Sequence, residues 1–305
     1  MLSRRAFLER GSLALAAMSL HTARAADAQV GPLGKPIGLQ LYTVREAAAK
    51  DLPGTLRAIA AIGYREVELA GIPAMSAPDL RKVLSDCGLT APSMHASMAD
   101  LQTGLNQRID YATTLGTRYL VCSFPWTADS RFRESPGKAV VSLPSGITLD
   151  DWKWNADFLN QKAQALKSAG IAVGYHNHNN EFAPIDGTTG MDVLLKETDP
   201  SLVTFEMDAG WVTAAGYDPF ALLKEHKGRF TLMHVKDIKA TTKSNFVLKQ
   251  DPTEVGSGMI DWKKLLPAAY ESGVRQFFVE QEPPFAHPRI ESTKISHDYL
   301  ASVAA

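Results

Sequence analysis

Cysteine is scarce in this chain, which contains only Cys87 and Cys122 among its 305 residues. Two cysteines cannot build the framework of several bridges that holds a small disulfide-rich domain together. Cys87 falls at the end of an expected helix and Cys122 inside an expected strand. We therefore expect two buried thiols rather than a disulfide.

A marked excess of either charge is also absent. The 32 basic and 33 acidic residues give a formal net charge of −1. This balance gives no support for binding to nucleic acid or to a membrane surface through bulk charge. Hydrophobic residues make up 45% of the chain, which is enough for a sizeable core. The length is ordinary for a single α/β barrel, and no composition shift marks a second domain.

The apolar stretch at 13–20 is too short to span a bilayer, so we expect no stable membrane anchor. It follows the segment 3–8 (Ser-Arg-Arg-Ala-Phe-Leu), which resembles a twin-arginine export signal, and precedes a small-x-small cleavage site at 23–25. This order predicts a signal peptide over 1–25, a linker over 26–35, the twin-arginine export machinery as a partner and a periplasmic location. The alternative is a short N-terminal helix with two incidental arginines.

Short apolar runs alternate with amphipathic stretches after residue 36. We predict strands at 37–42, 66–69, 90–95, 119–123, 172–176, 203–207, 231–235 and 276–280. We predict helices at 46–61, 78–86, 105–115, 151–168, 190–197, 218–226, 261–271 and 291–302. The helical stretches end at glycines: Gly63, Gly88, Gly116, Gly170, Gly228 and Gly273. Eight strand–helix units predict one closed parallel (β/α)8 TIM barrel over 36–305.

Two long segments, 124–149 and 237–260, follow the carboxyl ends of predicted strands, where barrel enzymes place their reaction sites. We expect both to be functional lids. The second contains Gly256-Ser257-Gly258, a weak candidate for a phosphate-binding loop that chain flexibility explains equally well. The usual glycine-rich phosphate loop is absent.

Polar side chains stand where the predicted strands end, and these ends meet at one mouth of a parallel barrel. The residues at or just beyond the strand ends are Glu68, His95, His176, Asp208, His234 and Glu280. Imidazole nitrogens mixed with carboxylate oxygens suit Mn, Mg, Co or Zn, and the absence of thiolates argues against a structural zinc site. We therefore predict one divalent metal ion at the mouth.

Three of these motifs resemble those of the sugar phosphate isomerase/epimerase-like proteins, which belong to the xylose-isomerase-like TIM barrels. They are 174–178 (Gly-Tyr-His-Asn-His), 205–208 (Phe-Glu-Met-Asp, followed by Gly-Trp) and 234–237 (His-Val-Lys-Asp). The resemblance covers nearly all of 36–303. It implies that one ion is held at the ends of strands five to eight, commonly by Glu, Asp, His and Glu.

Carried onto this sequence, the last three family ligands fall on Asp208, His234 and Glu280. The first falls on His176, where many members carry Glu, and Glu181 is an alternative ligand if the strand end curls back. In the family's epimerases, two metal-bound glutamates are also the two proton-transfer bases. The histidine here puts a two-base epimerase mechanism in doubt.

The roles we assign follow from enolisation, in which a proton beside a carbonyl group is removed. Glu280 takes the proton, with His178 or Glu181 as alternatives. Lys236 and His95 bind substrate oxygens, although His95 is equally well a hydrogen-bonded core residue. Three further residues are expected to meet the substrate: Glu68, or else this glutamate forms a salt bridge, and the flat rings of Trp126 and Trp211.

Three functions remain open at this point. The first is a metal-dependent isomerase or epimerase of an unphosphorylated sugar or keto-sugar, since an exported enzyme meets few phosphorylated sugars. The second is a lyase or dehydratase acting on a keto-sugar or 3-keto-glycoside. The third is a periplasmic sugar-binding protein with a degenerate site. The sequence leaves homo-oligomerisation open.

The export signal is tested by replacing Arg4 and Arg5 together with lysine. We expect the variant to stay in the cytoplasm with an uncleaved N-terminus, because the twin-arginine pair is the feature that the pathway reads. Cell fractionation and intact-mass measurement check both points. Normal periplasmic maturation of the variant would show that these arginines are incidental.

Overall fold

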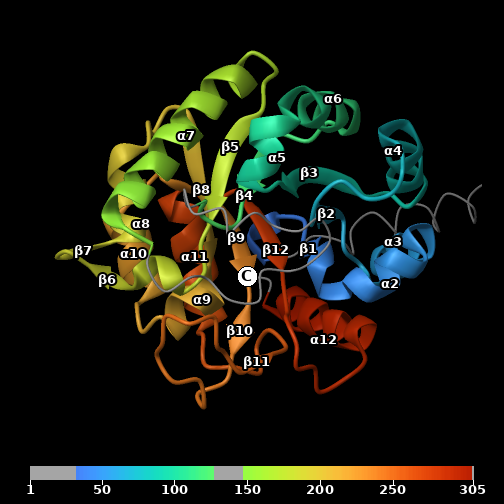
Figure 1. The fold of residues 1–305 in the computed structure, drawn as a ribbon. Coiled ribbons are helices and arrows are strands. Elements are labelled where there is room, and N and C mark those ends of the chain that lie inside the picture. The colour runs from blue at the N-terminus through green and yellow to red at the C-terminus, as the bar shows by residue number, and fades with distance from the viewer. Residues whose placement is uncertain (1–31, 127–146, 304–305) are drawn as a thin grey trace, which may run out of the picture.

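The computed structural model describes residues 32–126 and 147–303, which form a closed barrel of parallel strands with helices outside it (Figure 1). The strand order around the barrel is β1-β12-β9-β8-β5-β4-β3-β2, and every neighbouring pair is parallel. The predicted TIM barrel is thereby confirmed. The predicted signal peptide lies outside the described residues, as does most of the 124–149 segment.

The eight barrel strands lie within two residues of their predicted bounds. They are β1 (Gly38–Gln40), β2 (Glu66–Leu69), β3 (Thr90–His95), β4 (Tyr119–Cys122), β5 (Ala172–His176), β8 (Val203–Asp208), β9 (Phe230–Val235) and β12 (Gln276–Val279). The outer helices are α2 (Arg45–Lys50), α3 (Leu52–Ile62), α4 (Ala77–Asp86), α6 (Leu105–Leu115), α7 (Leu149–Lys167), α8 (Gly190–Glu197), α10 (Pro219–Glu225), α11 (Trp262–Ser272) and α12 (Arg289–Ser302).

The strands have apolar sequences because both of their faces are buried. Side chains alternate between the barrel interior and the helices, and both environments exclude water. In β12 all four residues are buried, and in β9 five of six are buried. Strands of this kind carry continuous hydrophobic sequence, which is why the runs stood out. A polar residue within or just after such a strand is therefore placed in a dry environment and requires a partner.

The single helix predicted at 46–61 is wrong, because the chain breaks at Asp51 into α2 and α3. The Asp51 carboxylate accepts a hydrogen bond from the Gly54 N–H (2.9 Å), which caps the start of α3. Pro53 follows in the first turn, where its missing N–H costs nothing. An Asp-x-Pro sequence therefore begins a new helix inside an otherwise continuous amphipathic pattern.

Short elements at the carboxyl ends of strands were not predicted. They are the one-turn helix η2 (Leu41–Val44), α5 (Met98–Thr103), η4 (Asn180–Phe182), the hairpin β6 (Pro184–Ile185) and β7 (Thr188–Thr189), α9 (Ala209–Ala214), and the hairpin β10 (Asp237–Ile238) and β11 (Pro252–Thr253). All are too short for a periodic pattern. The glycines predicted to end helices all have positive φ, which favours glycine at those positions.

The two cysteines are not joined in a disulfide: Cys122 is buried in β4, and Cys87 is half-buried at the end of α4. Within 32–126 and 147–303, no helix is both long and apolar enough to cross a membrane.

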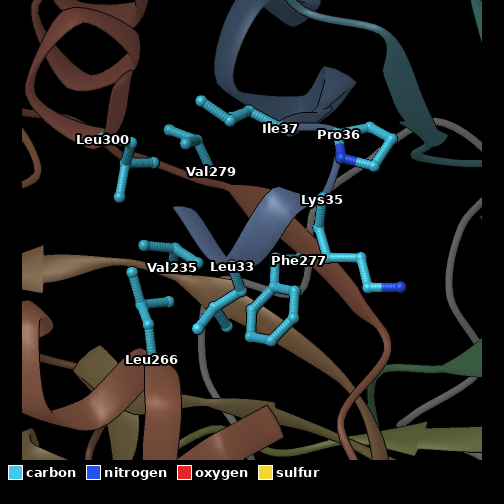
Figure 2. Close-up of a pocket in the computed structure, with 9 residues that line it drawn as sticks. All are labelled: Leu33, Lys35, Pro36, Ile37, Val235, Leu266, Phe277, Val279 and Leu300. Carbon is cyan, nitrogen blue, oxygen red and sulfur yellow. The ribbon is translucent and has the colours of Figure 1, made fainter. Parts of the chain in front are cut away.

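An apolar cavity lies between the barrel strands and the outer helices (Figure 2). Val235 and Val279 line it from the strand side, and Leu266 and Leu300 line it from α11 and α12. Its single charged lining residue is Lys35. None of the polar residues at the strand ends reaches this cavity, so it is a packing space rather than the reaction site.

Candidate metal centre

The mouth of the barrel gathers polar side chains because neighbouring strands are in register there. His176 at the end of β5 pairs with Glu206 of β8, and Asp208 of β8 pairs with His234 of β9. Glu206 and Asp208 are two residues apart on one strand, so both point to the same side, into the barrel. All four residues are buried.

The first cluster, which we call the outer group, consists of His176, Asp208, His234 and Glu280. Each offers one ligand atom, and these atoms lie within 4.8 Å of one another. Two opposite ligands that each bind one ion at about 2.1 Å are about 4.2 Å apart, so the ligand atoms lie near the spacing that an ion requires. His234 Nδ1 lies 2.9 Å from Glu280 Oε2 and 3.7 Å from Asp208 Oδ2. Two imidazoles and two carboxylates form a donor set that fits a divalent ion such as Zn or Mn.

The second cluster, the inner group, consists of His95, His176, Glu206 and His234, whose ligand atoms also lie within 4.8 Å of one another. Glu206 Oε2 stands at its centre. It lies 2.9 Å from His95 Nε2, 3.2 Å from His176 Nδ1 and 3.1 Å from His234 Nε2. The two groups share His176 and His234. Glu206 lies beside His176 Nδ1 and His234 Nε2, whereas Asp208 lies within 4.0 Å of the other nitrogen of each ring.

Lys236 is a fully buried cation beside the outer group. Its Nζ lies 2.9 Å from both Asp208 Oδ2 and Glu280 Oε2, and 2.7 Å from Glu282 Oε1. Burial alone would lower the pKa of Lys236, but these three carboxylates raise the pKa well above its ordinary value. The ammonium group is therefore charged. Its stem passes Gly210, where a Cβ atom would lie 2.8 Å from Lys236 Cγ, so only glycine leaves room.

Glu280 is ionised in this setting. Burial opposes ionisation, but the neighbouring Lys236 and His234 hold the pKa of Glu280 well below its usual range. An ionised carboxylate suits a metal ligand. A low pKa also makes it a weak proton acceptor, which does not favour the base role predicted for it.

His178 and Glu181 lie beyond the end of β5, and they differ in what they face. Glu181 accepts hydrogen bonds from the Tyr175 hydroxyl (2.9 Å) and the His178 N–H (2.8 Å). Its burial raises its pKa to about 7. Both carboxylate oxygens are thus engaged away from the outer group, where His176 supplies the fourth ligand atom. The geometry favours His176 over Glu181 as the ligand.

His178 contacts two aromatic rings, and its buried Nδ1 lies 4.0 Å from Glu181 Oε1. Its ring stacks on Phe124 with centroids 4.2 Å apart and lies 5.6 Å from the Trp211 ring. Its Nδ1 has no hydrogen-bond partner within the described ranges. Burial, with the nearby charge of Lys236, lowers the pKa of His178 well below its ordinary value, so the imidazole is neutral and has a lone pair to offer.

The substrate-binding role predicted for Glu68 does not fit its surroundings. Glu68 has no exposed surface and accepts hydrogen bonds from Gln40 Nε2 (2.8 Å) and Ser93 Oγ (2.5 Å). It also lies 2.6 Å from His234 Nε2. It therefore sits beneath the outer group and has no open side toward a substrate. His95 stacks on His234 and keeps 13% of its side chain exposed, so it retains access to the mouth.

The two tryptophans lie in different places. Trp211 is buried, with its ring 5.0 Å from Lys236 Nζ and its Nε1 donating to Glu282 Oε1 (3.3 Å). It shapes the wall behind the lysine. Trp126 packs edge-on against Trp154 of α7, and its backbone N–H donates to the Asn155 side chain. The structure thus attaches Trp126 to the outer helix α7 and places Trp211 beside the outer group.

The sequence reasoning gave no role to Glu206, Gln40, Ser93 or Glu282. Glu206 carried one usable signal, because it stands two residues before Asp208 on the same predicted strand and must face the same way. The other three are recognised only from contacts across strands.

The glycine loop at 256–258 is organised by an internal carboxylate. Asp237 Oδ2 accepts hydrogen bonds from the Gly256 N–H (2.9 Å), the Gly258 N–H (3.1 Å) and the Trp262 Nε1–H (2.9 Å). A Cβ atom on Gly258 would lie 2.1 Å from Asp237 Oδ1, so glycine is required there. Because Asp237 already uses these amides, they are not arranged to hold a phosphate group.

Residues 56–303 match the family model described as xylose isomerase-like TIM barrel, and the chain therefore belongs to that family. An inosose dehydratase of Geobacillus kaustophilus (strain HTA426) is 24% identical over 281 residues, which cover 82% of this chain and 89% of that protein. The chain spans only about half of the length of several other inosose dehydratases that it matches.

Solved structures agree on the fold. A sugar phosphate isomerase/epimerase from Parabacteroides distasonis ATCC 8503 is 26% identical with a TM-score of 0.72, covering 88% of this chain and 94% of that one. The IolI protein, solved with a zinc atom, is 14% identical with a TM-score of 0.67, covering 88% and 97%. At that identity the likeness to IolI shows the fold alone. The named relatives include a dehydratase and an isomerase/epimerase, so the family contains enzymes of more than one reaction type.

Removal of one carboxylate from the outer group tests the metal centre. Asp208 Oδ1 caps α9 through the Trp211 N–H (2.8 Å), so Asp208→Asn preserves a capping oxygen while it removes the charge. We expect metal affinity to fall by at least about a hundredfold, since losing a ligand costs more than the 10–100-fold typical of its supporting contacts. Elemental analysis and titration calorimetry measure the loss.

The matched control is Asp218→Asn, which alters an N-cap aspartate of α10 that accepts from the Phe220 N–H (2.9 Å). This variant should bind metal like the parent. Equal metal content in Asp208→Asn and the parent would remove Asp208 from the ligand set.

The loop anchor is tested by Asp237→Asn. In either orientation, the introduced amide would place its NH2 group against backbone or indole N–H groups, and two donors cannot form a hydrogen bond. We therefore expect the free energy of unfolding to fall by about 1–3 kcal/mol. Urea unfolding measures this value. Asp251→Asn, a partly exposed change in the same segment that weakens the ion pair with Lys239 (3.2 Å), should shift it by less than about 1 kcal/mol. Equal stability of Asp237→Asn and the parent would contradict the anchoring role.

Proposed function

We propose that this member of the xylose isomerase-like TIM barrel family is a divalent-metal-dependent isomerase or epimerase of an unphosphorylated sugar or keto-sugar. The observation that carries the proposal is the outer group: two imidazoles and two carboxylates with ligand atoms within 4.8 Å of one another at the barrel mouth. A charged lysine and a neutral histidine flank it. Their combination suits removal of a proton next to a carbonyl group.

The residues that would hold the ion are His176, Asp208, His234 and Glu280. When bound, a divalent ion polarises a carbonyl oxygen and so makes the neighbouring C–H more acidic. The buried setting strengthens this effect, because Asp208 and His234 have no exposed surface and water does not screen their charges.

Lys236 has no exposed surface, and its three N–H donors face three carboxylates, so its role here is to fix the charge of the outer group rather than to bind a substrate oxygen as the sequence predicted. Its ammonium group is charged and is held in place by carboxylates on three sides. A fixed cation needs no reorganisation as charge develops in the reaction. His95, whose side chain keeps 13% of its surface exposed, is better placed to bind a substrate oxygen.

Two residues compete for the role of base. Glu280 lies within the outer group, but its low pKa makes it a weak acceptor. His178 is neutral, and within the described residues its buried Nδ1 has no hydrogen-bond partner. Glu181 is less suitable, because its oxygens accept hydrogen bonds from Tyr175 and His178.

A lyase or dehydratase fits about equally well. His176 stands where many relatives carry a glutamate, so the site has one fewer carboxylate for a two-base epimerisation. Elimination requires only one base near the carbon and one acid near the leaving group. The relative from Geobacillus kaustophilus is an inosose dehydratase, which supports this alternative. Its substrate class would be a keto-sugar or 3-keto-glycoside.

The absence of phosphate from the proposed substrate rests on two features. The amides of Gly256 and Gly258 already donate to Asp237, so this loop offers no phosphate site. The predicted signal peptide also implies a periplasmic enzyme, and it remains a prediction that the fractionation experiment tests.

Proton exchange distinguishes the remaining possibilities. The metal-loaded enzyme is incubated with a panel of keto-sugars and 3-keto-glycosides in deuterated water, and deuterium incorporation is followed by NMR. We expect Glu280→Gln to retain metal at lower affinity, because the amide keeps one ligating oxygen. If Glu280 is the base, exchange should slow by about a hundredfold or more. Glu254→Gln, a buried glutamate that accepts from Ser292 Oγ (2.7 Å), is the matched control.

The outcomes separate clearly. Undiminished exchange in metal-loaded Glu280→Gln would move the base to His178 or Glu181. No exchange by the parent with any substrate of the panel would count against enolisation and favour a sugar-binding protein. Among exchanging substrates, product analysis tells isomerisation or epimerisation from elimination.

A further inference from the structure

We infer that Glu206 and Glu68 are positioning residues that decide which nitrogen of His176 and His234 is presented to the ion. They would thereby assign the metal to the outer group rather than to the inner group. The inference rests on the proposed metal dependence but not on the reaction type.

His234 lies between two pairs of carboxylates. Its Nε2 lies 2.6 Å from Glu68 Oε2 and 3.1 Å from Glu206 Oε2, on the inner side. Its Nδ1 faces Glu280 and Asp208 on the outer side. A ring that holds an ion is a neutral imidazole, which has one N–H and one lone pair. An N–H on Nε2 satisfies the inner carboxylates and leaves the Nδ1 lone pair for an ion shared with Asp208 and Glu280.

His176 shows the same arrangement with its nitrogens exchanged. Its Nδ1 lies 3.2 Å from Glu206 Oε2, and its Nε2 lies 4.0 Å from Asp208 Oδ2. An N–H on Nδ1 directed at Glu206 leaves the Nε2 lone pair on the side of Asp208. One carboxylate oxygen, Glu206 Oε2, therefore orients both shared rings. Supporting carboxylates of this kind commonly fix the tautomer of metal-binding histidines.

Glu68 is fixed before any ion arrives. Gln40 Nε2 donates to its Oε2 (2.8 Å) and Ser93 Oγ to its Oε1 (2.5 Å), and none of its surface is exposed. An ion in the inner group would need the lone pair of His234 Nε2, but the nearest oxygen there belongs to Glu68, which is not an inner-group ligand. The oxygen nearest to Nδ1 belongs to Glu280, which is itself an outer-group ligand. An ion in the inner group would also leave Asp208 and Glu280 without an imidazole ligand. The inner group is therefore better suited to accept N–H groups than to hold an ion.

The first test uses the unmodified protein. Zinc titration by calorimetry should give one ion per chain. Long-range 1H–15N NMR of the zinc-loaded, 15N-histidine-labelled protein should place the remaining ring protons on Nε2 of His234 and Nδ1 of His176. Two ions per chain, or ring protons on the opposite nitrogens, would overturn the inference. Neither reading depends on how a variant folds.

The second test is Glu206→Gln, which keeps the shape of the side chain and removes its charge. We expect zinc affinity to fall about 10–100-fold, the typical loss for such a supporting contact, with stoichiometry still one. The NMR spectrum should show a mixture of tautomers or a shifted His176 Nδ1 proton. Glu254→Gln should match the parent in both measurements, and circular dichroism checks that each variant is folded.

Parent-like affinity and an unchanged ring-proton pattern in folded Glu206→Gln would contradict the positioning role. If the parent binds one zinc with the expected ring protons but exchanges no substrate proton, the inference stands and the enolisation proposal fails. If the parent binds no divalent ion, both fail.

Discussion

The arrangement of the mouth depends on compensating buried negative charge. Glu68, Glu206, Asp208 and Glu280 are all buried at this end of the barrel. An isolated ionised carboxylate is very costly in such a place, so each needs a cation or several donors. Lys236 and the three rings of His95, His176 and His234 supply them, and every distance in the site reflects this pairing. A divalent ion at the outer group would add to the same compensation.

The barrel makes this compensation possible through register. Parallel strands bring residues from distant parts of the sequence to one level, such as His176 beside Glu206 and Asp208 beside His234. The two-residue period of β8 then stacks Glu206 below Asp208 on the inside. As a result the site has two layers. The outer layer offers ligand atoms, and the inner layer holds the rings that carry them.

Much of the fold followed from sequence because its signals are local. Buried strands appear as apolar runs, and glycines with positive φ end the helices. The break at Asp51 was missed because a capping aspartate and a proline interrupted an amphipathic pattern that itself continued. In the site, the sequence identified the residues at the strand ends. It did not show which of them belong to the outer group and which lie beneath it. Glu68 was expected to meet substrate, yet its donors Gln40 and Ser93 come from two other strands. Such contacts depend on cross-strand register, which sequence periodicity does not contain.

The histidine at position 176 stands where the family resemblance implies a glutamate. A glutamate there would bring one more negative charge and a second carboxylate base. The imidazole brings neither, and it needs Glu206 to orient it. The loss of one charge leaves the outer group with two carboxylates beside a charged lysine, so a bound ion would be a stronger electrophile than in a site with three carboxylates. A stronger electrophile with fewer bases suits chemistry that removes one proton and expels a group about as well as chemistry that moves a proton between two faces. A histidine in place of a glutamate thus changes the charge of the outer group without changing the strands that position it.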